Sequence, residues 1–273
     1  MTDRYAVIGQ PIAHSLSPRI HQQFARSLGV TLCYEAIEIS ADRLEMMLPR
    51  LHSEHYLGLN VTLPHKTAVS ALCEKHSERA ELAGAVNVLV RSATGWCGDN
   101  TDGEGFLCDL DRLGIALQGR RVLVLGAGGA VRGILAPLLS RAPAEVVVSG
   151  RTPWRPEEIA KVFAALGPIR PAAHLALKGD RFDLVINGTA AGHEGTVPRL
   201  PQGLFADGAA AYDLSYGKAA EPFLAWAEAQ GAALRSDGVG MLVEQAAASF
   251  ALWRGQRPET APVLAALRES GGT

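Results

Sequence analysis

A glycine cluster, Gly126, Gly128 and Gly129, is the first feature of this chain that suggests chemistry. It follows four apolar residues, 122–125, which are typical of a strand buried on both faces, and apolar residues recur at helical spacing from Val131. A glycine turn between a strand and a helix lets the backbone approach a pyrophosphate, and the helix N-terminus offers N–H groups to the anion. The cluster predicts a phosphate-binding turn. The alternative is a strand–helix turn without a ligand, because Val131 occupies the third glycine position of the usual pattern.

Two arginines, Arg151 and Arg155, follow the next predicted strand, 145–149. In a unit that binds NAD, this strand usually ends in an acidic residue that holds the ribose 2′-hydroxyl. Here the segment offers two guanidinium groups and the hydroxyl of Thr152, with no acid among residues 150–155. Because an arginine fork suits a phosphate and an acid would repel it, the segment favours NADP over NAD. A solvated basic loop is the alternative.

Polar side chains also follow the strands predicted in the first part of the chain. They are Ser15, Ser17, Thr62, Lys66, Asn87 and Asp102. Ligands of open α/β sheets bind at the carboxyl ends of strands, and hydroxyls, an amide and a charged pair there suit a small polyhydroxylated acid. Each residue also has a structural alternative, such as a helix cap for Ser17 and Asp102 or a solvated position for Lys66.

Two successive alternations of strand and helix would position these groups, which predicts an α/β protein with mostly parallel sheets. The second alternation has the pattern of a Rossmann-like dinucleotide-binding domain. The last two predicted helices, 241–253 and from Pro262, have no strand to pair with, so we expect them to return to the first unit. We therefore expect a discontinuous α/β substrate-binding and catalytic domain, residues 1–102 and 240–273, and an NADP-binding domain, residues 103–239.

Composition argues against several classes of protein. The 273 residues are 48% hydrophobic and 20% charged, which is ordinary for a globular protein. A formal net charge of −2 gives no bulk electrostatic case for nucleic acid or an anionic membrane. The four cysteines show neither C-x-x-C nor zinc-ligand spacing, no apolar run has the length of a membrane span, and the N-terminus lacks a signal-peptide pattern. We expect a cytoplasmic protein without a metal, which is a monomer or a homodimer.

Taken in order, the motifs closely resemble those of shikimate dehydrogenases. The matching stretches span nearly the full chain: residues 8–18 (IGQPIAHSLSP), 58–66 (GLNVTLPHK), 84–87 (GAVN), 98–103 (GDNTDG), 126–133 (GAGGAVRG), Arg151-Thr152 with Arg155, 187–189 (NGT), 212–216 (YDLSY), 238–245 (GVGMLVEQ) and 253–255 (WRG). The resemblance implies NADP-linked interconversion of 3-dehydroshikimate and shikimate, in chorismate and aromatic amino-acid biosynthesis.

The resemblance also implies roles for individual residues, with Lys66 and Asp102 as the catalytic pair. The residues implied to hold the substrate, beside that pair, are Ser15, Ser17, Thr62, Asn87, Tyr216 and Gln245. Those implied to hold the cofactor are Gly126, Ala127, Gly128, Gly129, Ala130, Gly150, Arg151, Thr152, Arg155, Leu214 and Gly238. Three positions depart from the family pattern: Gly150 for Asn, Val88 for Thr and Gly188 for Ala. The first departure would remove a polar contact near the adenosine.

Lys66 would exchange a proton with the substrate oxygen, and its ammonium would stabilise a developing alkoxide, while Asp102 holds the lysine in place. Two other functions remain open at this stage. One is a quinate/shikimate dehydrogenase of broader specificity, since one ring hydroxyl separates the two substrates. The other is a non-catalytic NADP-binding sensor, which would not need both Lys66 and Asp102.

Overall fold

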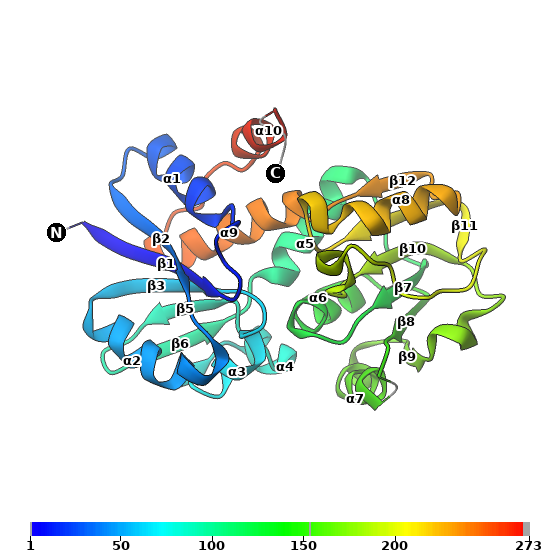
Figure 1. The fold of residues 1–273 in the computed structure, drawn as a ribbon, viewed down its shortest axis with the longest axis horizontal. Helices are drawn as coiled ribbons and strands as arrows, with labels where there is room; N and C mark the ends of the chain where they lie inside the picture. Colours follow the sequence, from blue (N-terminus) through cyan, green and yellow to red (C-terminus); the bar gives the residue numbers. More distant parts are fainter. Residues whose placement is uncertain (1, 153, 270–273) are drawn as a thin grey trace.

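The structure, a computed structural model, describes residues 2–152 and 154–269, and these residues form two six-stranded sheets (Figure 1). The first sheet has the order β2-β1-β3-β5-β6-β4 and the second β12-β11-β10-β7-β8-β9. The strands of the first sheet are β1 (Asp3–Gly9), β2 (Leu32–Glu38), β3 (Tyr56–Val61), β4 (Lys75–His76), β5 (Val88–Arg91) and β6 (Trp96–Asp99). Those of the second are β7 (Arg121–Leu125), β8 (Glu145–Ser149), β9 (Ile169–Ala172), β10 (Phe182–Asn187), β11 (Phe205–Asp213) and β12 (Leu234–Ser236).

The first sheet is mixed, because β5 runs antiparallel to both β3 and β6, while β2, β1 and β3 pair in parallel. The helical elements of this part are α1 (Ser17–Ser27), η1 (Ala41–Arg43), α2 (Leu44–Ser53), α3 (Lys66–Ser70) and α4 (Glu78–Ala83). The helix expected after Ser17 is confirmed, but Leu16 is its N-cap residue. Ser17 therefore does not have the capping role that the sequence left open.

The second sheet is parallel at every strand pair of the described residues. Its β7 contains the apolar run 122–125, whose side chains are fully buried, as expected for a central strand. The helical elements that accompany it are α6 (Gly129–Ser140), α7 (Trp154–Phe163), η2 (Ala164–Leu166), η3 (His174–Leu177), η4 (Ala191–Glu194), η5 (Gly217–Ala219) and α8 (Glu221–Ala229). The sequence did not predict the edge strand β9, because Pro171 interrupts its pattern.

Three further helices, α5 (Asp102–Leu113), α9 (Val239–Arg254) and α10 (Ala261–Glu269), complete the fold. Helices α5 and α9 pack on each other and lie between the two sheets, and α9 also contacts α1, β3 and β5 (Figure 1). At their crossing, a Cβ atom at Gly240 would lie 1.9 Å from Oδ1 of the buried Asp109. The hydroxyl of Tyr212, in β11, donates to the other oxygen of Asp109 at 2.6 Å, so the crossing is also tied to the second sheet.

The described ranges, 2–152 and 154–269, contain neither a helix that could span a membrane nor a cluster of metal-ligating side chains. No helix of these residues has the length and apolar character needed to cross a membrane. No group of three or more His, Cys, Asp or Glu side chains in the same ranges could hold a metal ion.

His21 is a fully buried histidine of α1. Its ring stacks on Tyr34 with centroids 4.2 Å apart and planes inclined by 7°, and Phe250 lies nearby. Neither ring nitrogen has a hydrogen-bond partner among the described residues. Because burial disfavours the charged ring, the pKa of His21 falls from 6.5 to about 3. Burial also raises the pKa of the facing Tyr34 well above its ordinary value. Tyr34 therefore stays uncharged and offers no negative charge to a protonated His21.

We expect His21 to make the fold sensitive to acid. Below pH 6.5 the unfolded chain binds a proton on this ring and the native chain does not, so stability is lost as the pH falls from 6.5 towards 3. At about 1.4 kcal/mol per pH unit, the loss is about 3 kcal/mol by roughly pH 4.5. Urea unfolding of the wild type and of His21→Phe over this range should show a shallower pH slope in the variant. Equal slopes would contradict the prediction, and His193→Gln, at an exposed position of η4, is the control.

Candidate active site

Lys66 and Asp102 form a buried ion pair, in which Lys66 Nζ donates to Asp102 Oδ2. Lys66 is the first residue of α3, and Asp102 is the first residue of α5. Their side chains are 14% and 3% exposed. Because water is largely excluded, each charge depends on the other for its stabilisation. Thr101 is the N-cap residue of α5 and its side chain makes no capping hydrogen bond, so Asp102 is not the cap that the sequence left open.

The Asn87 side chain holds the second oxygen of Asp102. Its Nδ2 donates to Asp102 Oδ1 at 2.8 Å, to Thr101 Oγ1 at 3.0 Å and to Gln245 Oε1 at 3.2 Å. Its Oδ1 accepts from the Thr101 backbone N–H at 2.8 Å. With one carboxylate oxygen on Asn87 and the other on Lys66, the direction of the Asp102 carboxylate is fixed. Three residues that the resemblance assigns to the substrate site, Asn87, Asp102 and Gln245, thus lie together.

The backbone around Asn87 joins the two members of the ion pair. The Val86 N–H donates to the Lys66 carbonyl at 2.8 Å. The Asn100 Nδ2 donates to the Ala85 carbonyl at 2.8 Å, and its Oδ1 accepts from the Asp102 N–H at 3.0 Å. The segment 85–87 therefore connects the start of α3 to the start of α5.

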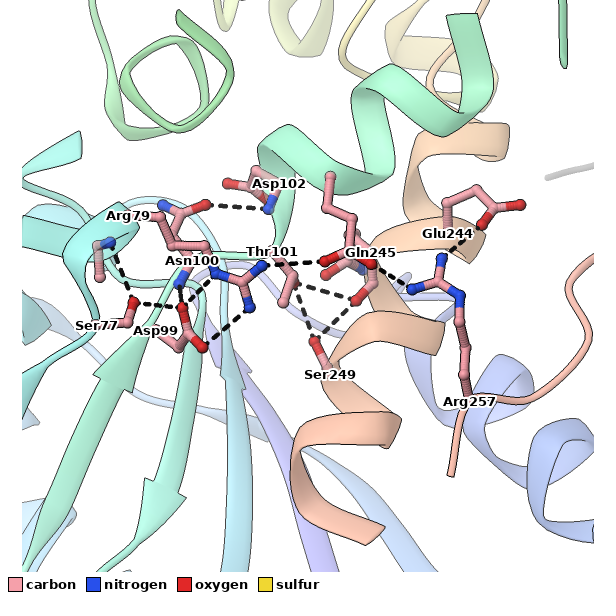
Figure 2. A network of polar contacts seen from close by, with 12 residues as sticks. Ser77, Arg79, Asp99, Asn100, Thr101, Asp102, Glu244, Gln245, Ser249 and Arg257 are labelled. Atoms are coloured by element: carbon pink, nitrogen blue, oxygen red, sulfur yellow. Dashed lines mark hydrogen bonds and ion pairs between the residues drawn. The ribbon is translucent and has the colours of Figure 1, made fainter. Parts of the chain in front are cut away.

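Behind the ion pair lies a buried polar layer that sequence analysis missed. Asn60 Oδ1 accepts from the Tyr34 hydroxyl at 2.7 Å, and Asn60 Nδ2 donates to Ser249 Oγ at 3.0 Å. Ser249 Oγ in turn lies 3.2 Å from Thr101 Oγ1 (Figure 2). The available signal was a polar residue in an apolar run: Asn60 in the strand 57–61, and Ser249 in the apolar helix 241–253.

Ser15, Ser17 and Thr62 lie where the first and third strands end. The Ser17 N–H donates to Ser15 Oγ at 3.3 Å. The Thr62 N–H donates to the Ile8 carbonyl at 3.0 Å, which places Thr62 beside the end of β1. Among the described residues, no hydrogen bond links these three side chains directly to Lys66 or Asp102. These three residues lie at the same edge of the sheet as the ion pair, but they are not hydrogen-bonded to it.

Tyr216 follows β11 in the second sheet but packs against the first part of the chain. It borders the apolar cluster that includes Ile20 and Val243, and Leu16 borders the same cluster. Burial raises the pKa of the Tyr216 hydroxyl above its ordinary value. Tyr216 therefore approaches the start of α1 from across the boundary between the two sheets.

The glycine turn lies directly beside Lys66. Gly126 has a φ of +108°, which L side chains rarely adopt. Gly128 is the N-cap residue of α6, no side chain within the described ranges caps it, and a Cβ atom there would meet no described atom within 4 Å. A Cβ atom at Gly129 would lie 2.9 Å from Cβ of Lys66. An anion at this helix N-terminus would therefore lie next to the ion pair.

The segment after β8 carries Arg151 and Arg155 on the surface, with Thr152 partly buried between them. The Arg155 guanidinium lies 5.4 Å from the Trp154 ring centroid. Gly150, the departure from the family pattern, leaves little room, because a Cβ atom there would lie 3.1 Å from Pro156 Cγ. The segment presents two exposed cations at the carboxyl end of β8, on the side where β7 carries the glycine turn.

Leu214 and Gly238 lie at the ends of β11 and β12. The Leu214 N–H donates to the Asn187 carbonyl, and the Gly238 N–H donates to the Ser215 carbonyl, both at 2.8 Å. Asp213 is buried and accepts from Asn187 Nδ2 at 2.8 Å and from the Ser215 N–H at 2.8 Å. Burial outweighs these hydrogen bonds and raises the pKa of Asp213 to about 7. Because β7, β10, β11 and β12 are parallel, Leu214 and Gly238 lie at the same sheet edge as the glycine turn, which includes Ala127 and Ala130.

Comparison with known proteins shows which family the chain resembles. Residues 7–89 match the model of the shikimate dehydrogenase substrate binding domain, and residues 238–268 match that of the shikimate 5′-dehydrogenase C-terminal domain. Shikimate dehydrogenase (NADP(+)) of Alkalilimnicola ehrlichii is 51% identical over 98% of this chain and 99% of its own length. The enzyme of the same name from Nitrosospira multiformis is 49% identical over the full length of both chains. The solved structure of shikimate 5-dehydrogenase from Thermus thermophilus, in complex with NADP(H) and shikimate, is 37% identical, with a TM-score of 0.84 over 98% of this chain and 99% of that one.

Proposed function

Because the chain belongs to the shikimate dehydrogenase family, we propose that Lys66 and Asp102 are the catalytic pair of its reaction. The protein is an NADP-dependent oxidoreductase that reversibly reduces 3-dehydroshikimate to shikimate, a step of chorismate and aromatic amino-acid biosynthesis. The observation that carries the catalytic assignment is the buried Lys66–Asp102 ion pair in contact with the glycine turn.

The residues present fit NADP. The uncapped start of α6 and the open space at Gly128 suit the pyrophosphate, and Arg151, Thr152 and Arg155 suit a 2′-phosphate. The other residues that we propose to line the cofactor site are Gly126, Ala127, Gly129, Ala130, Gly150, Leu214 and Gly238. When bound, NADPH supplies the hydride that reaches the carbonyl carbon of 3-dehydroshikimate.

Lys66 supplies the proton that the carbonyl oxygen needs in the reduction. Its Nζ proton passes to that oxygen as the alkoxide develops, and the lysine is then reprotonated from solvent. The ammonium also stabilises the negative charge on the oxygen before the proton moves. Asp102, which is held by Asn87, keeps Lys66 Nζ in place. In the oxidation direction the same groups act in reverse.

We propose that the substrate is held by Ser15, Ser17, Thr62, Asn87, Tyr216 and Gln245, together with the catalytic pair. Asn87 and Gln245 are already hydrogen-bonded to each other beside Asp102. Hydroxyl groups of serine, threonine and tyrosine can both donate to and accept from the ring hydroxyls and the carboxylate of shikimate.

The wider organisation is also a proposal. We propose that residues 1–102 and 240–273 form the substrate-binding domain and residues 103–239 the NADP-binding domain, which is supported by the packing of α9 and α10 against α1. We propose a cytoplasmic enzyme, supported by four free cysteines, which is a monomer or a homodimer.

The initial rate of NADP reduction with shikimate tests the function. We expect fast turnover that is confined to shikimate and NADP, with NAD and quinate run in parallel as controls. Comparable rates with quinate or NAD would instead indicate an enzyme of broader specificity. Binding of NADPH without turnover of any pair would indicate a sensor.

A further inference from the structure

Arg79 of α4 clamps the strand that leads into the proposed catalytic carboxylate (Figure 2). Its Nε donates to Asp99 Oδ1 at 2.6 Å and its Nη2 donates to Asp99 Oδ2 at 3.0 Å. Two parallel bonds of this kind fix direction as well as distance. The remaining nitrogen, Nη1, donates to Glu104 Oε2 at 3.0 Å. The guanidinium therefore contacts the chain three residues before Asp102 and two residues after it.

The Asp99 carboxylate is the centre of this clamp. Besides Arg79 it accepts from the Ser77 hydroxyl at 2.5 Å and from the Asn100 N–H at 2.6 Å. Its side chain is 12% exposed. Burial raises the pKa of Asp99, but the hydrogen bonds from Arg79 and Ser77 outweigh that effect, so its pKa lies below the ordinary value. The charged form therefore persists and holds the turn between β6 and α5.

The turn passes this constraint on to Asp102. The Asn100 N–H is held by Asp99, and the Asn100 side chain accepts from the Asp102 N–H. Glu104, held by the third nitrogen of Arg79, lies in the first turn of α5. Displacement of the turn would thus rotate Asp102 away from Lys66.

We propose that Arg79 is a positioning residue for the reduction: by clamping Asp99 and Glu104, it directs the Asp102 carboxylate at Lys66. This proposal rests on the catalytic role proposed above for Lys66 and Asp102. An ordinary surface ion pair would add little to stability and would not affect the chemical step.

The chain offers a matched control in Arg257. Its side chain is 39% exposed against 41% for Arg79, and it also pairs with Glu104, but its other partner is Glu244 rather than Asp99. We expect Arg79→Gln to lower kcat about 10-fold with both KM values within about twofold, because loss of alignment affects the chemical step. Arg257→Gln should keep kcat within about twofold. Rates are normalised to NADPH-binding sites counted by fluorescence titration, which removes any difference in folded fraction.

A double-mutant cycle separates positioning from stability. In an Asp102→Asn background, Arg79→Gln should cost less than about twofold, because there is no carboxylate left to direct. The same loss in both backgrounds, or an equal loss in Arg257→Gln, would overturn the proposal. If Arg79→Gln does not fold, Asp99→Asn is measured in its place, with the same expected loss of kcat. If the Asp102→Asn variant keeps wild-type kcat, both the catalytic role of the Lys66–Asp102 pair and the positioning role of Arg79 are overturned. If Asp102→Asn loses most of its kcat but Arg79→Gln keeps wild-type kcat, only the positioning role of Arg79 is overturned.

Discussion

Replacement of Lys66 by alanine is expected to lower kcat at least about 100-fold, the usual loss when general acid–base catalysis is removed. The KM for shikimate should change little, because Asn87, Gln245 and the strand-end hydroxyls stay in place. The variant removes the proton donor and also leaves Asp102, 3% exposed, without its cation. Steady-state formation of NADPH from shikimate, followed by absorbance, measures the effect.

Lys75→Ala is the control for this experiment, because Lys75 is an exposed lysine of the edge strand β4 in the same sheet. It should keep wild-type kcat. A Lys66→Ala variant that retained near-wild-type kcat would refute the acid–base role, and the proton would then have to come from another group.

Replacement of both Arg151 and Arg155 by alanine is expected to raise the KM for NADP about 100-fold and to leave the KM for NAD nearly unchanged. A hydrogen bond to a charged group contributes about 1.5–3 kcal/mol to binding. Because both arginines are exposed to solvent, we take the contribution of each to be at the low end of that range. Only NADP carries the 2′-phosphate, so only its binding should suffer. The preference for NADP over NAD would then largely disappear.

Arg141→Ala is the matched control, because Arg141 is an exposed arginine of the same part of the chain that pairs with Asp111. The Arg141→Ala variant should keep the wild-type KM values for NADP and for NAD. An equal loss with both cofactors in the double variant would show that the arginines serve binding in general. An unchanged KM for NADP would mean that the segment is the solvated loop that the sequence left open.

Local patterns predicted most of the fold. The run 122–125 had to be buried because it is apolar on both faces, and the Ser17-Pro18 pair marked the start of α1. Strand β4 has only two residues, and β9 carries Pro171, so neither has a periodicity that sequence can reveal. These edge strands form because a neighbouring strand offers them hydrogen-bond partners, which is tertiary information.

The candidate site was predictable only in part, for the same reason. Spacing alone could not show that Lys66 and Asp102 meet, and the resemblance supplied that pairing. The two residues meet because the segment 85–87 connects α3 to α5. The buried contacts of Asn60 and the clamp of Arg79 on Asp99 join residues from separate elements, so no local pattern reports them.

The chain passes between its two sheets only twice within the described residues, through α5 and at the entry to α9, and these helices touch along the crossing at Gly240 and Asp109. Two crossings so close together define one axis. A motion that separated Gly129 from Lys66 would therefore be a rotation about that axis. Asp102 and Gln245 lie on the axis helices and would move least, while Lys66 and the glycine turn, which come from different sheets, would move apart. Asn87, Asp102 and Gln245 would thus stay assembled, whereas Tyr216, which follows β11, would move with the second sheet and return to the other substrate residues only on closure.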